Sequence, residues 1–133
     1  MDSDPKTGQK KMPEAMLVVD HGSRRKAANE ALNSVVETLR ARCHDRFVTI
    51  EPAHMELSTP SIADAIDRCA AAGALHVRVA LFFLAPGRHV AEDVPALVAD
   101  AAASHPGLTW ELSAPLCESP ALIDAILELT VSG

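Results

Sequence analysis

Residues 16–23 read Met-Leu-Val-Val-Asp-His-Gly-Ser, and this stretch decides the class of fold. The apolar run is short, as in a buried strand. It leads into His21, and Gly22 permits the tight turn that follows. A second apolar run, Val77 to Phe83, is continuous like a central parallel strand and leads to His89. Because the carboxyl ends of parallel strands open into the ligand crevice, we expect both imidazoles at one crevice.

The remaining apolar spacing alternates between strand and helix periods. We expect strands at 16–20, 47–54, 77–83 and 108–112, and helices at about 27–43, from Thr59-Pro60 to Gly73, at about 94–104 and from Pro120 onward. The last helix is expected to bury Leu122, Ile123, Ile126 and Leu127.

This βαβαβαβα order predicts an α/β fold, because parallel strands need helical crossovers. The fold class expected is a doubly wound four-stranded parallel sheet flanked by helices on both faces. It forms a single domain over residues 15–133, and the polar, aperiodic residues 1–14 are expected to be a disordered tail.

Composition narrows the function classes. The chain has 133 residues, 48% of them hydrophobic, but no apolar run of the ~20 residues that a membrane span needs. Net charge is −6 and every Lys and Arg lies at or before Arg88, so we expect neither nucleic acid nor membrane as a partner. Three widely spaced cysteines argue against an iron–sulfur site. The acidic start of the chain favours a cytoplasmic location, with a processed plastid protein as the alternative.

Several polar residues follow the predicted strands. His54 and Glu56 are two residues apart after the second strand, so in extended chain they point the same way. Glu56 either joins a metal site or is an acid near the N-terminus of the next helix, where the helix dipole favours it. His54 is expected to have a structural or supporting role. Asp93 either caps the helix that follows, the interpretation we favour, or faces His89 across one helical turn.

Basic residues surround the two histidines. Ser23 is expected either to cap a helix or to donate to a carboxylate. Arg24, Arg25 and Arg88 form a basic rim in an acidic protein, which suggests an anionic small ligand, although each could be an ordinary surface charge. The other histidines, His44, His76 and His105, are expected to be structural. The chain has no phosphate-binding glycine loop, dinucleotide fingerprint or nucleophile elbow.

Three motifs resemble the sirohydrochlorin chelatases, the class II chelatases that insert iron or cobalt into a modified tetrapyrrole. They are Val19 to Arg24 (Val-Asp-His-Gly-Ser-Arg), Glu51 to Leu57 with Pro60-Ser61-Ile62, and Phe82 to His89 with Asp93-Val94-Pro95. The resemblance runs from about Met16 to Leu127 and is most similar to the single-domain ferrochelatases.

The resemblance implies that His21 and His89 are paired active-site histidines and that Glu56 helps handle the metal. It also implies a homodimer. Plant members carry a cysteine motif near the C-terminus that holds a cluster; since residues 131–133 carry no such motif, we expect no iron–sulfur cluster and no tightly bound cofactor.

Neutral histidines suit this chemistry, because metal insertion releases two pyrrole protons and imidazole ligates divalent iron or cobalt. We therefore expect an ATP-independent lyase that makes sirohaem from sirohydrochlorin and Fe²⁺. His21, His89 and Glu56 would be catalytic and metal-binding; Ser23, Arg24, Arg25 and Arg88 would bind the substrate carboxylates. The alternatives are a cobaltochelatase and a non-catalytic tetrapyrrole or metal carrier; a hydrolase or isomerase with a histidine base is remote.

Overall fold

The computed structural model describes residues 12–43, 45–85 and 87–131, and of residues 88–90 it describes the backbone alone. The elements in chain order are β1 (Glu14–Asp20), α1 (Lys26–Cys43), β2 (Thr49–His54), α2 (Ile62–Ala71), β3 (His76–Leu81), α3 (Arg88–Ala102), β4 (Thr109–Leu112), the 3₁₀ turn η1 (Leu116–Glu118) and α4 (Pro120–Thr130).

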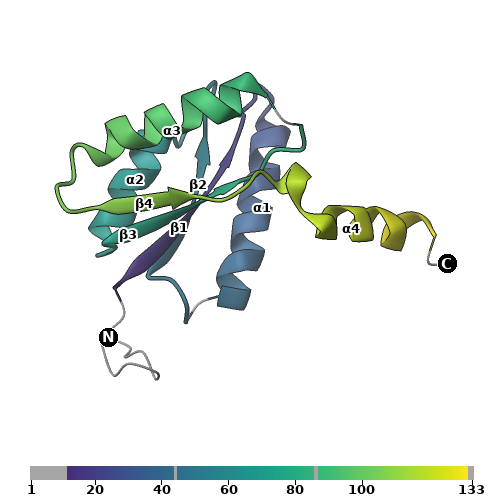
Figure 1. Cartoon of the computed structure of the whole chain (residues 1–133), viewed down its shortest axis with the longest axis horizontal. Helices are drawn as coiled ribbons and strands as arrows, with labels where there is room; N and C mark the ends of the chain where they lie inside the picture. Colours follow the sequence, from purple (N-terminus) through teal and green to yellow (C-terminus); the bar gives the residue numbers. More distant parts are fainter. Residues whose placement is uncertain (1–11, 44, 86, 132–133) are drawn as a thin grey trace.

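The four strands form one parallel sheet in the order β2-β1-β3-β4. Helix α1 packs over β1 and β2 on one face, while α2 and α3 pack together on the other (Figure 1). This confirms the predicted doubly wound sheet with helices on both faces. Because all strands are parallel, their carboxyl ends lie at a single edge.

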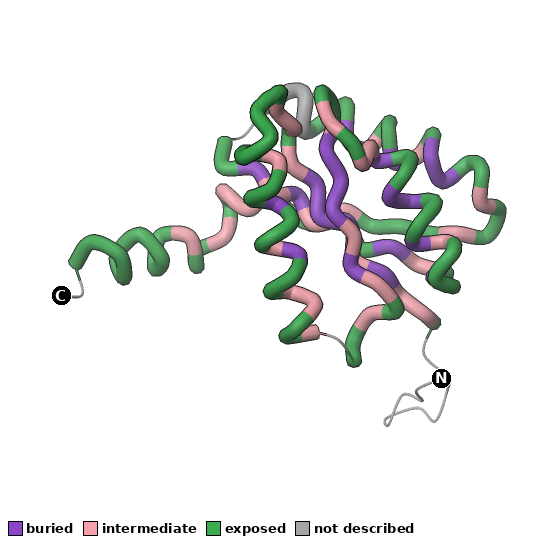
Figure 2. The backbone as a smooth tube through the Cα atoms, turned by 180° about the vertical axis from the view of Figure 1, so that it is seen from behind, coloured by how far each residue is buried: buried purple, intermediate pink, exposed green. Residues whose placement is uncertain are grey.

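Strand β1 supplies the centre of the core. Its side chains alternate between the faces: Leu17 and Val19 join the cluster under α2 and α3, and Val18 joins the one under α1. All three are fully buried, and the buried backbone in Figure 2 follows the strands at the middle of the molecule. The apolar run that predicted the strand is therefore explained by burial on both sides.

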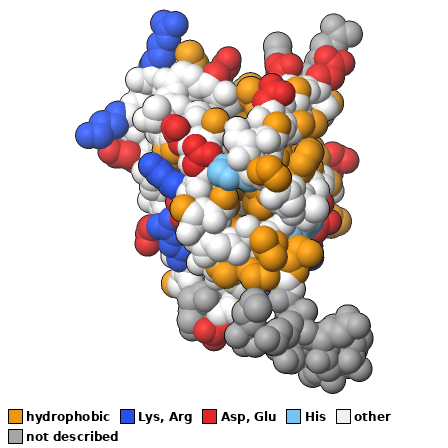
Figure 3. Space-filling view, turned by 90° about the vertical axis from the view of Figure 1, so that its left-hand side faces the viewer, with side chains coloured by type: hydrophobic (Ala, Val, Ile, Leu, Met, Phe, Trp, Pro, Cys, Tyr) orange, Lys and Arg blue, Asp and Glu red, His pale blue; other side chains and the backbone are white. Residues whose placement is uncertain are grey.

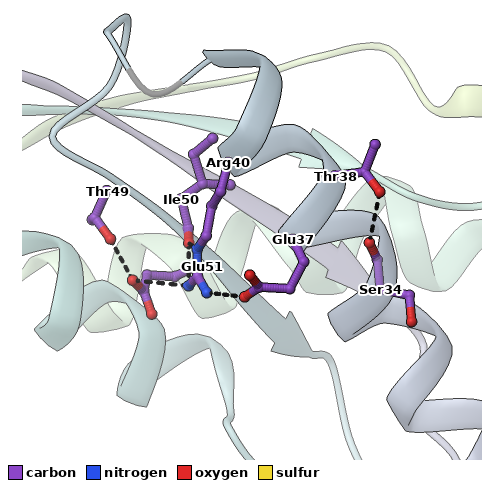
Figure 4. Close-up of polar contacts among 7 residues, drawn as sticks. All are labelled: Ser34, Glu37, Thr38, Arg40, Thr49, Ile50 and Glu51. Carbon is purple, nitrogen blue, oxygen red and sulfur yellow. Dashed lines mark hydrogen bonds and ion pairs between the residues drawn. The ribbon is translucent and has the colours of Figure 1, made fainter.

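An arginine fixes α1 against β2. The Arg40 guanidinium donates to the carbonyl oxygen of Ile50 from Nε at 2.9 Å and from Nη2 at 2.6 Å (Figure 4). Its Nη1 donates to Glu37 at 2.5 Å, and Nη2 lies 3.5 Å from Glu51. The Thr49 hydroxyl also donates to the Glu51 carboxylate. The helix is thus fastened to the edge strand by a charged donor as well as by apolar packing.

Two predicted helix starts are wrong. Helix α2 is capped by Ser61, not Thr59: Ser61 Oγ accepts from the backbone N–H of Asp64 at 3.1 Å, and Asp64 accepts from that of Ser61 at 3.0 Å. The Thr59-Pro60 peptide is cis, and Pro60 still belongs to the turn after β2, since its carbonyl oxygen accepts from His54 N at 2.9 Å. This reciprocal capping box stabilises the helix more fully than a lone threonine.

Helix α3 begins six residues before the predicted start. Gly87 is its N-cap and its first turn closes when Ala91 N donates to Gly87 O at 3.2 Å. Pro95 therefore lies inside the helix, at the cost of one backbone hydrogen bond. Asp93 is not the cap that we favoured; it lies one turn beyond His89 on the same helix.

Strand β1 begins inside the segment that was predicted to be a tail. Glu14 is the first residue of β1, and the Pro13 carbonyl oxygen accepts from Leu75 N at 2.9 Å. Residues 1–11 lie outside the described part of the chain, and so does His44. The ordered domain therefore begins within the segment predicted to be disordered.

The predicted burial of the last helix is also wrong. Helix α4 has no buried residue, and Ile123, Ile126 and Leu127 are at least half exposed. It projects from the body of the molecule instead of lying on the sheet, and its backbone is mostly exposed in Figure 2. Its amphipathic pattern correctly predicted a helix, but no described element buries that helix.

The end of the molecule opposite α4 has a mixed surface. Lys and Arg side chains lie along one border of this view, while hydrophobic, acidic and histidine side chains share the remainder (Figure 3). Within the described residues, no helix combines the length and apolar character required to cross a membrane.

Candidate active site at the carboxyl edge of the sheet

The chain segments that leave β1, β2 and β3 are joined at the carboxyl edge of the sheet by backbone hydrogen bonds. Met55 N donates to Asp20 O at 2.9 Å, and Glu56 N donates to His21 O at 3.1 Å. On the other side of β1, Phe82 N donates to Val19 O at 2.8 Å. The turn that carries His21 is therefore held between its two neighbours.

Gly22 makes this close contact sterically feasible. Its φ is +87°, in the left-handed region that favours glycine. A Cβ atom there would lie 1.9 Å from the carbonyl oxygen of Glu56. Only glycine lets the two turns touch, and the contact brings the predicted residues His21 and Glu56 together. Both residues are exposed to solvent.

The imidazole of His21 packs against a buried ring. It meets Phe83 edge to face, with ring centroids 4.9 Å apart and an interplanar angle of 81°. Phe83 is only 3% exposed, so it is a rigid support at the end of β3. No sequence rule distinguishes Phe83 from ordinary core, because an apolar residue near a strand end is usually buried.

A second histidine lies behind the turn. His54 is 2% exposed, and its Nδ1 is 2.6 Å from Asp20 Oδ1. The pair joins the last residues of β1 and β2, in the supporting role predicted for His54. Asp20 was missed as its partner, although an acid directly before His21 was the available signal. A carboxylate that accepts from a ring N–H fixes the tautomer of the imidazole.

Ser23 is tied to the start of α1. Its N–H donates to Asn29 Oδ1 at 2.9 Å, and its carbonyl oxygen accepts from Asn29 Nδ2 at 2.7 Å. Its hydroxyl accepts from Arg25 N at 3.0 Å, one residue before α1 begins, so it orders the turn that leads into the helix. Asn29 was not predicted, because no spacing rule links these two positions.

An open pocket of about 370 Å³ lies beside this turn. It is bounded by α1 and the loop after β2, and its lining includes Ser23, Arg24, Lys26, Asn29 and His54. Arg24 and Arg25 are both exposed, so their charges are available to an anionic ligand.

The other half of the predicted site lies on α3. The helix backbone starts at the same edge of the sheet, but the side chains of Arg88 and His89 lie outside what the structure describes. Within the described residues, no three His, Cys, Asp or Glu side chains are grouped to hold a metal ion. The described part of the site thus consists of His21, Glu56 and the basic turn that follows β1.

Comparison with known sequences identifies relatives that are named sirohydrochlorin chelatases. The chain is 42% identical over 113 residues to the sirohydrochlorin ferrochelatase, chloroplastic, of Arabidopsis thaliana, covering 85% of this chain and 49% of that protein. It is 35% identical over 85 residues to a sirohydrochlorin cobaltochelatase of Methanococcus maripaludis, covering 64% of this chain and 58% of that protein. The chain spans about half the length of these curated relatives.

Solved structures share the fold. SirB from Bacillus subtilis with Fe³⁺ superposes with a TM-score of 0.79 at 26% identity, covering 90% of this chain and 48% of that one. A cobalamin biosynthesis CbiX protein from Marinobacter aquaeolei VT8 gives a TM-score of 0.72 at 29% identity, covering 90% of this chain and 96% of that one. The CbiX family model matches residues 15–132, nearly the whole sheet and its helices, and this chain therefore belongs to the CbiX family.

Proposed function

We propose that this protein is a sirohydrochlorin ferrochelatase. The reaction places Fe²⁺ in the macrocycle and releases two pyrrole protons, so it needs proton acceptors and a transient metal site but no ATP. The observation that carries the proposal is the backbone contact between the His21 and Glu56 turns, which places these two exposed residues side by side at the carboxyl edge of the sheet. The 42% identity with the Arabidopsis ferrochelatase supports the choice of iron.

In this proposal, His21 and His89 accept the pyrrole protons and ligate the ion before it enters the macrocycle, and Glu56 assists. Imidazole is a suitable ligand for ferrous iron and titrates near neutral pH. Ser23, Arg24, Arg25 and Arg88 bind the anionic periphery of the tetrapyrrole. The lining of the pocket beside α1, which includes Ser23 and Arg24, supports this assignment.

An anaerobic metallation assay tests the proposal. Purified protein, Fe²⁺ and sirohydrochlorin should give multiple turnovers of sirohaem, followed by absorbance, faster than the spontaneous reaction. His21→Ala should lower the rate at least about tenfold, in the range typical of lost acid–base groups. His105→Ala is the matched control. The His105 imidazole hydrogen-bonds to Asp67, with 2.7 Å between the two atoms, and neither residue belongs to the candidate site. A rate unchanged in a chain carrying both His21→Ala and His89→Ala would refute the mechanism.

Cobalt is the second candidate metal. Relatives are named cobaltochelatases, and a SirB structure from Bacillus subtilis subspecies spizizenii is a complex with cobalt. Competition between Fe²⁺ and Co²⁺ on one substrate preparation decides between them. A non-catalytic carrier would shift the tetrapyrrole spectrum at stoichiometric protein and give no turnover.

We further propose that the protein acts as a homodimer in the cytoplasm. The approximately double length of SirB supports the pairing of two copies. The chloroplastic name of the Arabidopsis relative makes the plastid the alternative location, and a fluorescent fusion in the source cell distinguishes the two.

A further inference from the structure

We propose that Leu57 and Leu84 are substrate-contacting residues, which lie against one apolar face of the tetrapyrrole on either side of His21. The inference rests on the function proposed above and adds the surface that binds the macrocycle itself, apart from its carboxylates. It follows from the place of two exposed leucines beside His21, and from a backbone conformation that leucine adopts only at a cost.

The two leucines flank the turn that carries His21. Leu57 directly follows Glu56, whose backbone N–H donates to His21 O at 3.1 Å. Leu84 directly follows Phe83, whose ring meets the His21 imidazole edge to face. Because β1 lies between β2 and β3, one leucine follows the strand on each side of His21, at the carboxyl edge of the sheet.

The backbone that carries each leucine is fixed. His54 N donates to Pro60 O at 2.9 Å, which closes the base of the loop after β2, so Leu57 lies in a short loop that is anchored at both ends. After β3, Cys117 N donates at 3.0 Å to the carbonyl oxygen of the residue before Leu84. An apolar side chain on a fixed backbone loses less freedom when a ligand binds, and it therefore contributes more to affinity.

The stability of the folded chain explains neither leucine. Leu57 is 56% exposed and Leu84 is 67% exposed, so both bury little apolar surface. Leu57 also has φ +67°, and among the described residues it is the only one other than glycine with a positive φ. Glycine or asparagine adopts this left-handed backbone more readily. An exposed leucine held in a strained backbone therefore indicates a role outside the fold.

The surroundings of Leu57 indicate the class of ligand. Leu57 lines the pocket of about 370 Å³ beside α1, together with Ser23 and Arg24. An apolar side chain next to a hydroxyl and a cation suits a ligand with an apolar centre and anionic edges, such as a tetrapyrrole with carboxylate side chains. In the proposed reaction His21 reaches the pyrrole nitrogens at the centre of the ring, so side chains on either side of it meet the same face away from the centre.

Spectral titration with metal-free sirohydrochlorin measures this contact without turnover. Leu57→Asn and Leu84→Asn should each raise the dissociation constant about tenfold, since each removes part of the transfer free energy of a leucine side chain. Leu57→Met keeps an apolar side chain and should retain the wild-type affinity. Leu75→Asn is the matched control, because Leu75 is 51% exposed but precedes β3 at the amino edge of the sheet; it should leave the constant unchanged.

Urea unfolding separates substrate contact from a structural role. Because asparagine tolerates left-handed backbone better than leucine, Leu57→Asn should unfold at the same urea concentration as wild type or at a higher one, although it binds more weakly. Weaker binding together with a lower unfolding midpoint would assign Leu57 to the fold and overturn its contact with substrate.

The double variant Leu57→Asn, Leu84→Asn gives the decisive value. A dissociation constant within about twofold of wild type would overturn the inference. If light scattering also showed that this variant had lost an assembly present in wild type, the leucines would contact a second copy and not the tetrapyrrole.

Binding and turnover are measured separately, so this inference and the proposed function can fail separately. A protein that metallates sirohydrochlorin with an affinity independent of both leucines refutes the inference alone. A protein that binds sirohydrochlorin through these leucines but gives no turnover refutes the function alone. A protein that does not bind sirohydrochlorin refutes both.

Discussion

At the scale of single residues, the candidate site depends on a backbone contact. His21 and Glu56 come together because Gly22 lets the turn after β1 touch the turn after β2. Behind them, His54 and Asp20 join the same two strand ends through a buried hydrogen bond. The two exposed candidate residues thus lie in front of a hydrogen-bonded pair that joins the strand ends.

Gly22→Ala tests the contact. Left-handed backbone costs a non-glycine residue about 1–3 kcal/mol, and here the added methyl group would also collide with Glu56 O. Gly73→Ala is the matched control, because Gly73 has φ +95° and no atom within 4 Å of the added Cβ. Urea unfolding should show a clearly larger loss for Gly22→Ala. Equal losses would mean that the two turns separate without cost.

Asp20→Ala tests the buried pair. It leaves the imidazole of His54 without its carboxylate partner, and an unsatisfied buried polar group costs about 1–3 kcal/mol. Asp20→Asn retains an oxygen acceptor and should lose less. The free energy of unfolding at pH 7 distinguishes the two, and the idea fails if the asparagine variant is the less stable.

At the scale of elements, polar contacts fix the helices that frame the site. Arg40 fastens α1 to β2, and the box between Ser61 and Asp64 starts α2 directly after the loop that carries Glu56. Neither the Arg40 bonds nor the Ser61–Asp64 capping box includes a residue of the candidate site. They hold the walls of the site at fixed positions.

Arg40→Met should lower the free energy of unfolding by about 1–2 kcal/mol, since its charge-assisted bonds to Ile50 O are only partly screened from solvent. Arg42→Met, an exposed position two residues later on α1, serves as the control and should change stability by less than about 0.5 kcal/mol. Chemical denaturation measures both. Equal effects would show that the bond to β2 adds nothing.

Ser61→Ala should lower the free energy of unfolding by about 1 kcal/mol, the usual loss on removing a helix N-cap. Chemical denaturation measures this loss.

The contribution of the Asp64 carboxylate to the same capping box depends on pH. Accepting from the backbone N–H of Ser61 lowers the pKa of Asp64 below its ordinary 3.8. The carboxylate therefore stabilises the folded state above that value, and this contribution is lost as the pH falls through the folded pKa. Asp64→Asn should accordingly differ from wild type at pH 7 and converge with it in strong acid.

Much of this architecture could be predicted from the sequence. Apolar periodicity located the described strands and helices, and in the centre of the fold it reports burial, as Val18 and Leu32 show. It also located β4 and α4, although β4 is mostly exposed and α4 has no buried residue. The predicted helix boundaries were wrong where a single residue suggested a different start. Pro95 is typical of the first turn of a helix, yet it lies inside α3. The contact of His21 with Phe83 and the clamp of Asn29 join positions with no sequence rule, so only the folded chain shows them.

At the scale of the whole molecule, the two faces of the sheet are unequally covered. The larger core lies under α2 and α3, and Cys69 of α2 is fully buried within it. Burial, with a smaller contribution from Glu51, raises the pKa of its thiol to about 12. Cys43 and Cys117 are only half-buried. The reactivity of Cys43 and Cys117 therefore reports the folded surface, whereas the reactivity of Cys69 reports unfolding of the core.

Thiol labelling under native conditions should modify Cys43 and Cys117 within minutes and leave Cys69 unmodified, because a buried thiol with a raised pKa is not a nucleophile. Cys69 should react only at the rate of global unfolding, followed by mass spectrometry in increasing urea. Labelling of Cys69 well below the unfolding transition would show that α2 opens separately from the sheet.

The strand order β2-β1-β3-β4 has a consequence for biosynthesis. Among the four described strands, the first to be translated is an inner one, and each later strand pairs with one that has already been made: β2 with β1, β3 with β1, and β4 with β3. The sheet can therefore grow outward in the order of translation, with no strand waiting for a neighbour still to be synthesised.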